Sequence, residues 1–147
     1  MAIILLRHAK AGDRDEWSGD DALRPLSKPG RRQAEAMVET LKAFRLTRIL
    51  SSPSVRCVET VAPLAAARGL KVEESDVLAE GAGSKDALIL IRELEDDAVL
   101  CTHGDVLMHL IRTLTKRYWD TPKGGGWLLE VGDSGPRVIR AVPPPSD

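Results

Sequence analysis

The stretch Ala2 to Leu6 reads AIILL, and Arg7 and His8 follow it without a break. A short, continuous aliphatic run of this kind is typical of a strand buried on both faces, as in a parallel sheet covered by helices. The stretch Ala98 to Thr102 reads AVLCT, has the same character and is followed at once by His103. We therefore expect two buried strands of one sheet, each ending at a histidine.

Apolar runs alternate with amphipathic stretches along the rest of the chain, which is the pattern of an α/β domain. The further expected strands are Arg48 to Ser51, Leu70 to Glu74, Gly126 to Val131 and Arg137 to Val142. The expected helices run from Ser27 to near Phe44, from Ser52-Pro53 to about Arg68, from Ser84 through Leu94, and from Gly104 to about Arg117. We predict a single three-layer α/β/α domain over residues 1–147, with a mostly parallel sheet and a C-terminal antiparallel hairpin.

Composition excludes several classes of protein. The 21 Lys and Arg against 22 Asp and Glu give a net charge of -1, so we expect neither nucleic acid nor an anionic membrane as partner. No apolar stretch approaches the roughly 18 residues of a membrane span, and Met1 is followed by no secretory signal pattern. Cys57 and Cys101 are too few for a disulfide framework and are expected to be packed, reduced thiols, which favours a cytoplasmic protein.

The three histidines, His8, His103 and His109, are too few for a histidine-rich metal site. His109 lies in the middle of an expected helix, between Met108 and Leu110, and is expected to be a partly buried structural residue. The other two histidines each follow a strand, and nothing in a helix or strand requires histidine there.

Ligands of open α/β sheets bind beyond the carboxyl ends of the strands, and four chemically suitable residues are expected at that edge. These are Arg7, His8, His103 and Arg56, the last being one helical turn beyond the second strand. A histidine nitrogen is a competent nucleophile at neutral pH, and arginine pairs two phosphate oxygens at once and stays charged. The group is therefore suited to phosphoryl transfer.

Four ordered segments carry a resemblance that covers almost the whole chain. They are LLRHAKAG (Leu5 to Gly12), RPLSKPGRRQAE (Arg24 to Glu35), SSPSVRCVET (Ser51 to Thr60) and CTHGD (Cys101 to Asp105). Their order and spacing resemble the histidine phosphatase superfamily, whose fold is phosphoglycerate mutase-like. The chain looks most like SixA-type phosphohistidine phosphatases and also like the phosphatase-like domain appended to some Nudix hydrolases.

The resemblance implies that His8 is the nucleophile and becomes transiently phosphorylated. Arg7, Arg56 and His103 would complete the phosphate pocket, and water would then hydrolyse the phosphohistidine. The arginines supply positive charge, so the resemblance implies no metal and no cofactor.

Several carboxylates are candidates for the general acid. Glu80 matches the place where larger members of the superfamily carry this acid, and we rank it first. Asp105, directly after His103-Gly104, is better explained as an early-helix charge near the positive end of the helix dipole. Asp13 and Asp15, in the polar loop after the nucleophile, remain further choices.

The expected activity is that of a metal-independent phosphatase, most similar to a SixA-type protein phosphohistidine phosphatase. The alternatives are a phosphatase for small phosphate esters or nucleotide-derived compounds, and a non-catalytic phosphate-binding module. The expected partner is thus a phosphorylated protein or a small phosphorylated substrate. No Nudix motif occurs in the chain, so a Nudix-type partner would be a separate polypeptide. Trp17 either closes over substrate or covers its own loop.

Overall fold

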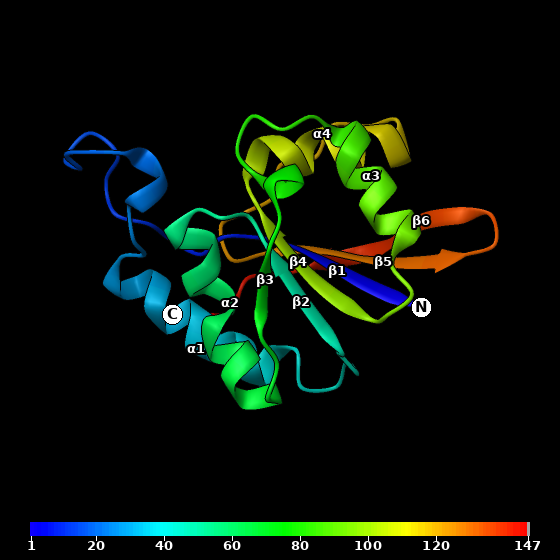
Figure 1. Cartoon of the computed structure of the whole chain (residues 1–147), viewed down its shortest axis with the longest axis horizontal. Coiled ribbons are helices and arrows are strands. Elements are labelled where there is room, and N and C mark those ends of the chain that lie inside the picture. The colour runs from blue at the N-terminus through cyan, green and yellow to red at the C-terminus, as the bar shows by residue number, and fades with distance from the viewer. Residues whose placement is uncertain (147) are drawn as a thin grey trace.

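The computed structural model describes residues 1–146, which form one mixed sheet flanked by helices (Figure 1). Its six strands lie side by side in the order β3-β2-β4-β1-β5-β6. They are β1 (Ala2–Arg7), β2 (Arg48–Ser51), β3 (Val72–Glu74), β4 (Ala98–Thr102), β5 (Gly126–Gly132) and β6 (Gly135–Val142). The first four strands pair in parallel, whereas β5 runs antiparallel to β1 and to β6. The predicted parallel sheet with a C-terminal hairpin is confirmed.

Helices cover both faces of the sheet and complete the three layers. Their bounds are α1 (Lys28–Thr40), α2 (Val55–Arg68), α3 (Ser84–Glu93) and α4 (Gly104–Thr115), with short 3-10 helices η1 (Asp21–Leu23) and η2 (Asp76–Leu78). Figure 1 shows α1 and α2 on one side of the sheet and α3 and α4 on the other. None of the helices in residues 1–146 has the length and apolar character needed to cross a membrane.

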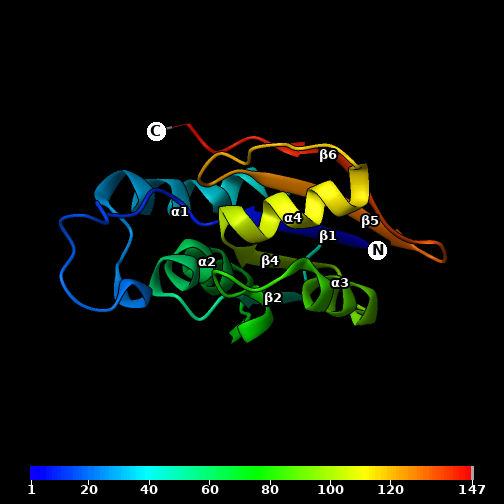
Figure 2. The ribbon, with the colours of Figure 1, turned by 90° about the horizontal axis from the view of Figure 1, so that it is seen from above.

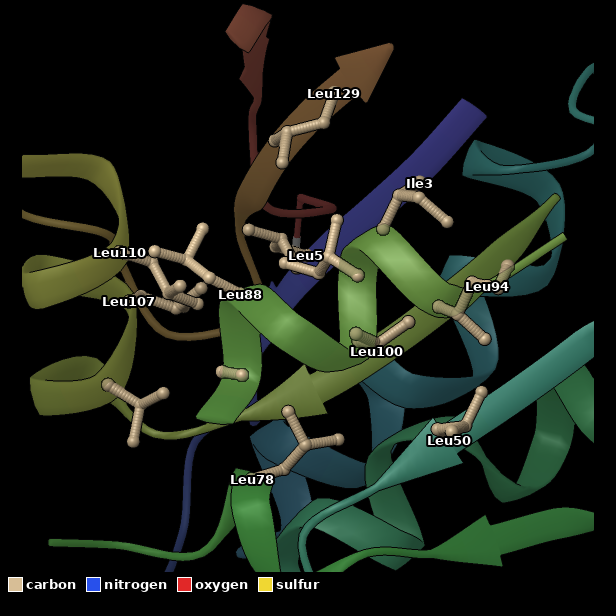
Figure 3. Packing of buried hydrophobic residues seen from close by; sticks show 14 of the residues in the cluster. Ile3, Leu5, Leu50, Leu78, Leu88, Leu94, Leu100, Leu107, Leu110 and Leu129 are labelled. Carbon is tan, nitrogen blue, oxygen red and sulfur yellow. The ribbon is translucent and has the colours of Figure 1, made fainter. Parts of the chain in front are cut away.

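Successive side chains of a strand point to opposite faces of the sheet, and this alternation divides the core into two clusters. Ile3 and Leu5 of β1 face α3 and α4, and their neighbours Ile4 and Leu6 face α1 and α2; all four are fully buried. Figure 3 shows the first cluster, where Leu107 and other leucines of the helices pack against the strand side chains. Each such side chain contributes about 1.5–3 kcal/mol on burial, which explains why the central strands need aliphatic residues on both faces.

Two helix ends differ from the sequence expectation. The second helix begins at Val55 with Ser54 as its N-cap, and not at Ser52-Pro53; the Ser52 hydroxyl contacts His103 and accepts the N–H of Ser54. The first helix begins as expected, with the Ser27 hydroxyl accepting the Gly30 N–H, but it ends at Thr40 before a short turn.

The carboxyl ends of the parallel strands lie at one end of the molecule. The long segment after β1, residues 9–27, projects from this end, opposite to the turn of the β5-β6 hairpin (Figures 1 and 2). The segments that follow β2, β3 and β4 reach the same edge, so residues distant in sequence can meet there.

Candidate active site

A cleft of about 850 Å³ opens at the carboxyl edge of the sheet. Arg7, His8, Glu80 and His103 line it together, from the segments that follow β1, β3 and β4. The buried Arg56 contacts Glu80 from the first turn of α2. The structure therefore brings together all the residues that the sequence placed first at the site.

The backbone carbonyl of Ala9 holds the His8 ring in one orientation. Nδ1 of the ring lies 2.8 Å from the carbonyl oxygen of Ala9, which can only accept a hydrogen bond. Burial and the nearby charges of His103, Arg56 and Arg7 lower the pKa of His8 to about 3, although the Ala9 hydrogen bond opposes the shift. The ring is therefore neutral near pH 7, with the proton on Nδ1 and the lone pair on Nε2.

His103 is the N-cap residue of α4 and is almost fully buried. Its Nε2 lies 2.8 Å from the Ser52 hydroxyl and 3.5 Å from the Cys57 sulfur. Its Nδ1 lies 3.6 Å from a carboxylate oxygen of Glu80 and 3.5 Å from Nη2 of Arg56. Contacts at both nitrogens fix the ring beside His8, where it can donate to an oxyanion when protonated.

The guanidinium of Arg56 is 1% exposed and shared between two acidic side chains. Its Nη2 lies 3.1 Å from Asp21 and 3.1 Å from Glu80, and Nη1 donates to the backbone carbonyl of Asp21. Its Nε has no hydrogen-bond partner within residues 1–146. Arg56 thus links η1 to the segment before α3 through Asp21 and Glu80.

Arg7 faces the cleft from the end of β1. Its Nη1 donates to the carbonyl oxygen of Thr121 over 2.8 Å, and its Nε is buried without a partner in the described chain. Burial lowers the pKa of Arg7, while Asp120 and Asp105 oppose that shift. Gly104 makes room for this guanidinium, because a Cβ at that position would lie 2.9 Å from its central carbon.

The other carboxylates named from the sequence are placed differently from Glu80. Asp105 accepts the Gly81 N–H over 2.8 Å and so holds the turn that carries Glu80. Asp13 lines the cleft, but one of its oxygens accepts the N–H of Asp15, an exposed residue away from the cleft lining. Glu80 is the one of the four with a contact to a histidine among residues 1–146.

Residues 3–88 match the family described as the histidine phosphatase superfamily (branch 1). The chain belongs to this superfamily. The predicted family is confirmed, and so is the phosphoglycerate mutase-like fold.

Solved structures of this superfamily superpose over nearly the whole chain. A SixA-type protein from Agrobacterium tumefaciens is 26% identical, with a TM-score of 0.80, and the match covers 97% of this chain and 98% of that one. The protein histidine phosphatase SixA complexed with tungstate is 19% identical, with a TM-score of 0.83 over 98% and 97% of the two chains, and shows the shared fold.

A curated relative of known activity has higher sequence identity. The 8-oxo-(d)GTP phosphatase of Mycolicibacterium smegmatis is 35% identical over 143 residues, covering 89% of this chain and 44% of the relative. This histidine phosphatase chain therefore spans less than half the length of that relative.

Sequence reasoning missed several residues of the site in this superfamily member. Ser52 directly follows β2 at the same sheet edge as Arg7, but its contact with His103 could not be predicted from the sequence. Cys57 is packed as expected, yet it also touches His103; burial raises its pKa, but hydrogen bonds with Cys101 and His103 outweigh this and lower it to about 6. No sequence pattern pointed to Asp21 as a site residue, because it lies in a polar loop with several other acidic residues.

Two other side chains named from the sequence, His109 and Trp17, lie outside the lining of the cleft. His109 is exposed on α4, so the expectation of a partly buried residue was wrong; its position faces solvent while Leu107 and Leu110 face the core. Trp17 is 38% exposed and its indole N–H donates to the Asp20 carbonyl, so it covers its own loop in this structure.

Proposed function

We propose that this chain hydrolyses phosphorylated substrates in two steps, with Nε2 of His8 as the nucleophile. The observation that carries this proposal is the neutral, oriented imidazole of His8 beside Arg7 and His103. In the first step Nε2 bonds to phosphorus as the bond to the leaving group breaks. In the second step water attacks the phosphohistidine, which releases inorganic phosphate and restores His8.

The positive groups near His8 would stabilise the transferring phosphoryl group. Arg7 and Arg56 each carry a buried Nε without a partner in residues 1–146, and a phosphate oxygen can accept from such donors. His103, fixed by Ser52, would add a further donor when protonated. Preorganised donors of this kind stabilise the charge that develops in the transition state.

Glu80 is the general acid that we propose for the leaving group. Its carboxylate lies at the cleft within 3.6 Å of His103, and Asp105 holds the turn that presents it. In the protonated form it would transfer its proton to the departing atom and then, as a carboxylate, accept a proton from the attacking water.

A protein phosphohistidine is one of two substrate classes that we propose. The 26% identity with the Agrobacterium SixA-type protein supports it, and the cleft lies at the molecular surface, where a protein side chain can enter. Small nucleotide-derived phosphates are the second class, favoured by the 35% identity with an 8-oxo-(d)GTP phosphatase. The proposal of a separate Nudix-type partner rests on the family resemblance alone. We also propose a cytoplasmic location, which the two free cysteines support.

Trapping the intermediate tests the proposed mechanism. The protein is incubated with a phosphorylated donor, quenched rapidly, and assayed for an acid-labile, base-stable phosphoryl group and its position. We expect phosphate on His8 in the native chain, none in His8→Ala, and unchanged labelling in the control His109→Ala, whose histidine is exposed on α4. Full activity of His8→Ala would overturn the mechanism.

A further inference from the structure

The loop between α4 and β5 is attached to the strand end that carries the nucleophile. The Gly124 N–H donates to the carbonyl oxygen of His8 over 3.0 Å, and the Arg7 N–H donates to the carbonyl oxygen of Gly125 over 2.8 Å. The side chain of Gln33, on α1, donates to the carbonyl oxygen of Lys123 over 3.3 Å. Lys123 is therefore carried by an anchored segment at the edge of the catalytic cleft.

The ammonium group of Lys123 lies among like charges. It lines the same cleft as His8, and no carboxylate of residues 1–146 forms an ion pair with it. Partial burial and then the charges of Arg7, Arg24, Arg14 and Lys10 lower the pKa of Lys123. The Lys123 side chain is also exposed, so an anionic ligand in the cleft can reach its ammonium group and offset the repulsion between these cations.

Two arginines of the loop that follows β1 line the cleft with Lys123. Arg24 is buried and bound to Asp21 at 3.0 Å, so its position is fixed, whereas Arg14 is largely exposed and contacts Asp21 and Glu80 at 3.5 and 3.4 Å. Such exposed ion pairs are weak, so Arg14 is available to a ligand at little energetic cost.

Within residues 1–146 no acidic side chain forms an ion pair with Lys123, although Asp21 pairs with Arg24 and Glu80 contacts Arg14. Asp120 acts on Arg7, Asp105 accepts the Gly81 N–H, and Glu80 contacts the buried Arg56 more closely than it contacts Arg14. Asp13 accepts the Asp15 N–H. None of these carboxylates is among the groups that shift the pKa of Lys123.

We propose that Lys123, with Arg24 and Arg14, forms a second anion subsite beside the phosphate pocket of Arg7 and His8. This inference rests on the proposed function, since it places the transferred phosphoryl group at His8. It names the substrate class as a small molecule with two adjacent phosphates, such as a nucleoside diphosphate. A single phosphoryl group occupies only part of a cleft of about 850 Å³, so space remains for a second anionic group.

The reaction on such a substrate balances without a further reactant. The terminal phosphoryl group transfers to Nε2 of His8 as the P–O bond to the inner phosphate breaks. The inner phosphate leaves as a monophosphate held by Lys123, and water then releases the terminal phosphate from His8. A phosphohistidine protein offers no inner phosphate, so the subsite favours the nucleotide-derived class over the protein class.

Equilibrium binding to the catalytically intact chain tests the subsite without turnover. The probes are inorganic phosphate and methylenediphosphonate, whose P–C–P bridge is not hydrolysed. We expect the native chain to prefer the diphosphonate, and Lys123→Gln to reduce the ratio of the two affinities by about tenfold, as for loss of one ligand charge pair worth about 1.4 kcal/mol. The control Lys71→Gln removes an exposed lysine outside the cleft lining and should keep the native ratio.

The possible outcomes distinguish failure of the subsite proposal from failure of the proposed function. A ratio that Lys123→Gln leaves at the native value overturns the subsite, whatever the chain hydrolyses. If no phosphorylated compound is hydrolysed but the ratio falls, the proposed function fails and the anion subsite stands. As a second readout, the native chain should hydrolyse a nucleoside diphosphate with a higher kcat/KM than the matching monophosphate, and Lys123→Gln should narrow that difference; an equal kcat/KM for both would overturn the substrate class.

Discussion

The imidazole rings of His8 and His103 lie edge to face, with centroids 5.5 Å apart and planes at 66°. The two rings are held in different ways. His103 is fixed by side chains at both nitrogens, whereas His8 is fixed at Nδ1 by the backbone carbonyl of Ala9. The arrangement leaves Nε2 of His8 as the unprotonated nitrogen and keeps His103 in place as its neighbour, which is the division of roles between nucleophile and phosphate ligand that we propose.

The neutral state of His8 has a consequence for stability against acid. Its pKa is about 3 in the folded chain and about 6.5 when unfolded. Between these values the unfolded chain binds a proton that the folded chain does not, so stability is complete above pH 6.5 and falls as the pH falls towards 3. We expect the native free energy of unfolding to drop by about 2 kcal/mol more than that of His8→Asn between pH 6.5 and 4.5. Urea unfolding curves at several pH values measure this, and parallel pH profiles of the two proteins would contradict it.

Gly104 provides a test of the placement of Arg7. In Gly104→Ala the new methyl group would lie 2.9 Å from the guanidinium carbon of Arg7, so the guanidinium must move. A displacement of about 1 Å in a positioned group costs on the order of 10²-fold in rate, and we expect kcat/KM to fall by about 10- to 100-fold. The matched control is Gly83→Ala, where nothing lies within 4 Å of the added methyl group and the backbone is extended. Equal kcat/KM values for the two variants would show that Arg7 does not act on the substrate.

The strand-end rule predicted Arg7 and His103 because both directly follow buried strands whose aliphatic runs are easily recognised. Ser52 follows a strand too, but Ser-Pro is also a common helix start, and local sequence cannot show which partner a hydroxyl takes. Lys123 lies in an irregular segment between α4 and β5, where no periodicity gives its direction. Its place depends on Gly124, whose φ of 82° and lack of room for a Cβ beside Gln33 are properties of the folded chain.

The contact between Ser52 and His103 predicts a loss of activity out of proportion to the loss of stability. Ser52→Ala removes the 2.8 Å hydrogen bond to Nε2 of His103, and Ser51→Ala removes an equally short buried bond to the carbonyl oxygen of Ser52. Each should lower the free energy of unfolding by about 1 kcal/mol. We expect only Ser52→Ala to lower kcat, by about tenfold, because the His103 ring loses its orientation. Steady-state kinetics beside denaturant titrations measure both quantities, and similar kcat values in the two variants would argue against this role of Ser52.

The general acid can be identified by comparing how much kcat falls, when the acid is removed, on substrates with good and with poor leaving groups. A poor leaving group such as an alkyl alcohol needs a proton in the transition state, whereas p-nitrophenolate leaves readily without one. We therefore expect Glu80→Gln to lower kcat on an alkyl phosphate by about 10²-fold or more, and to change kcat on p-nitrophenyl phosphate much less. Glu74→Gln, at the exposed end of β3, is the matched control and should behave as the native chain on both substrates. The carboxylate of Glu80 also contacts Arg56 at 3.1 Å, so an equal loss on the two substrates would instead mean that Glu80 acts by holding Arg56 and not by donating a proton.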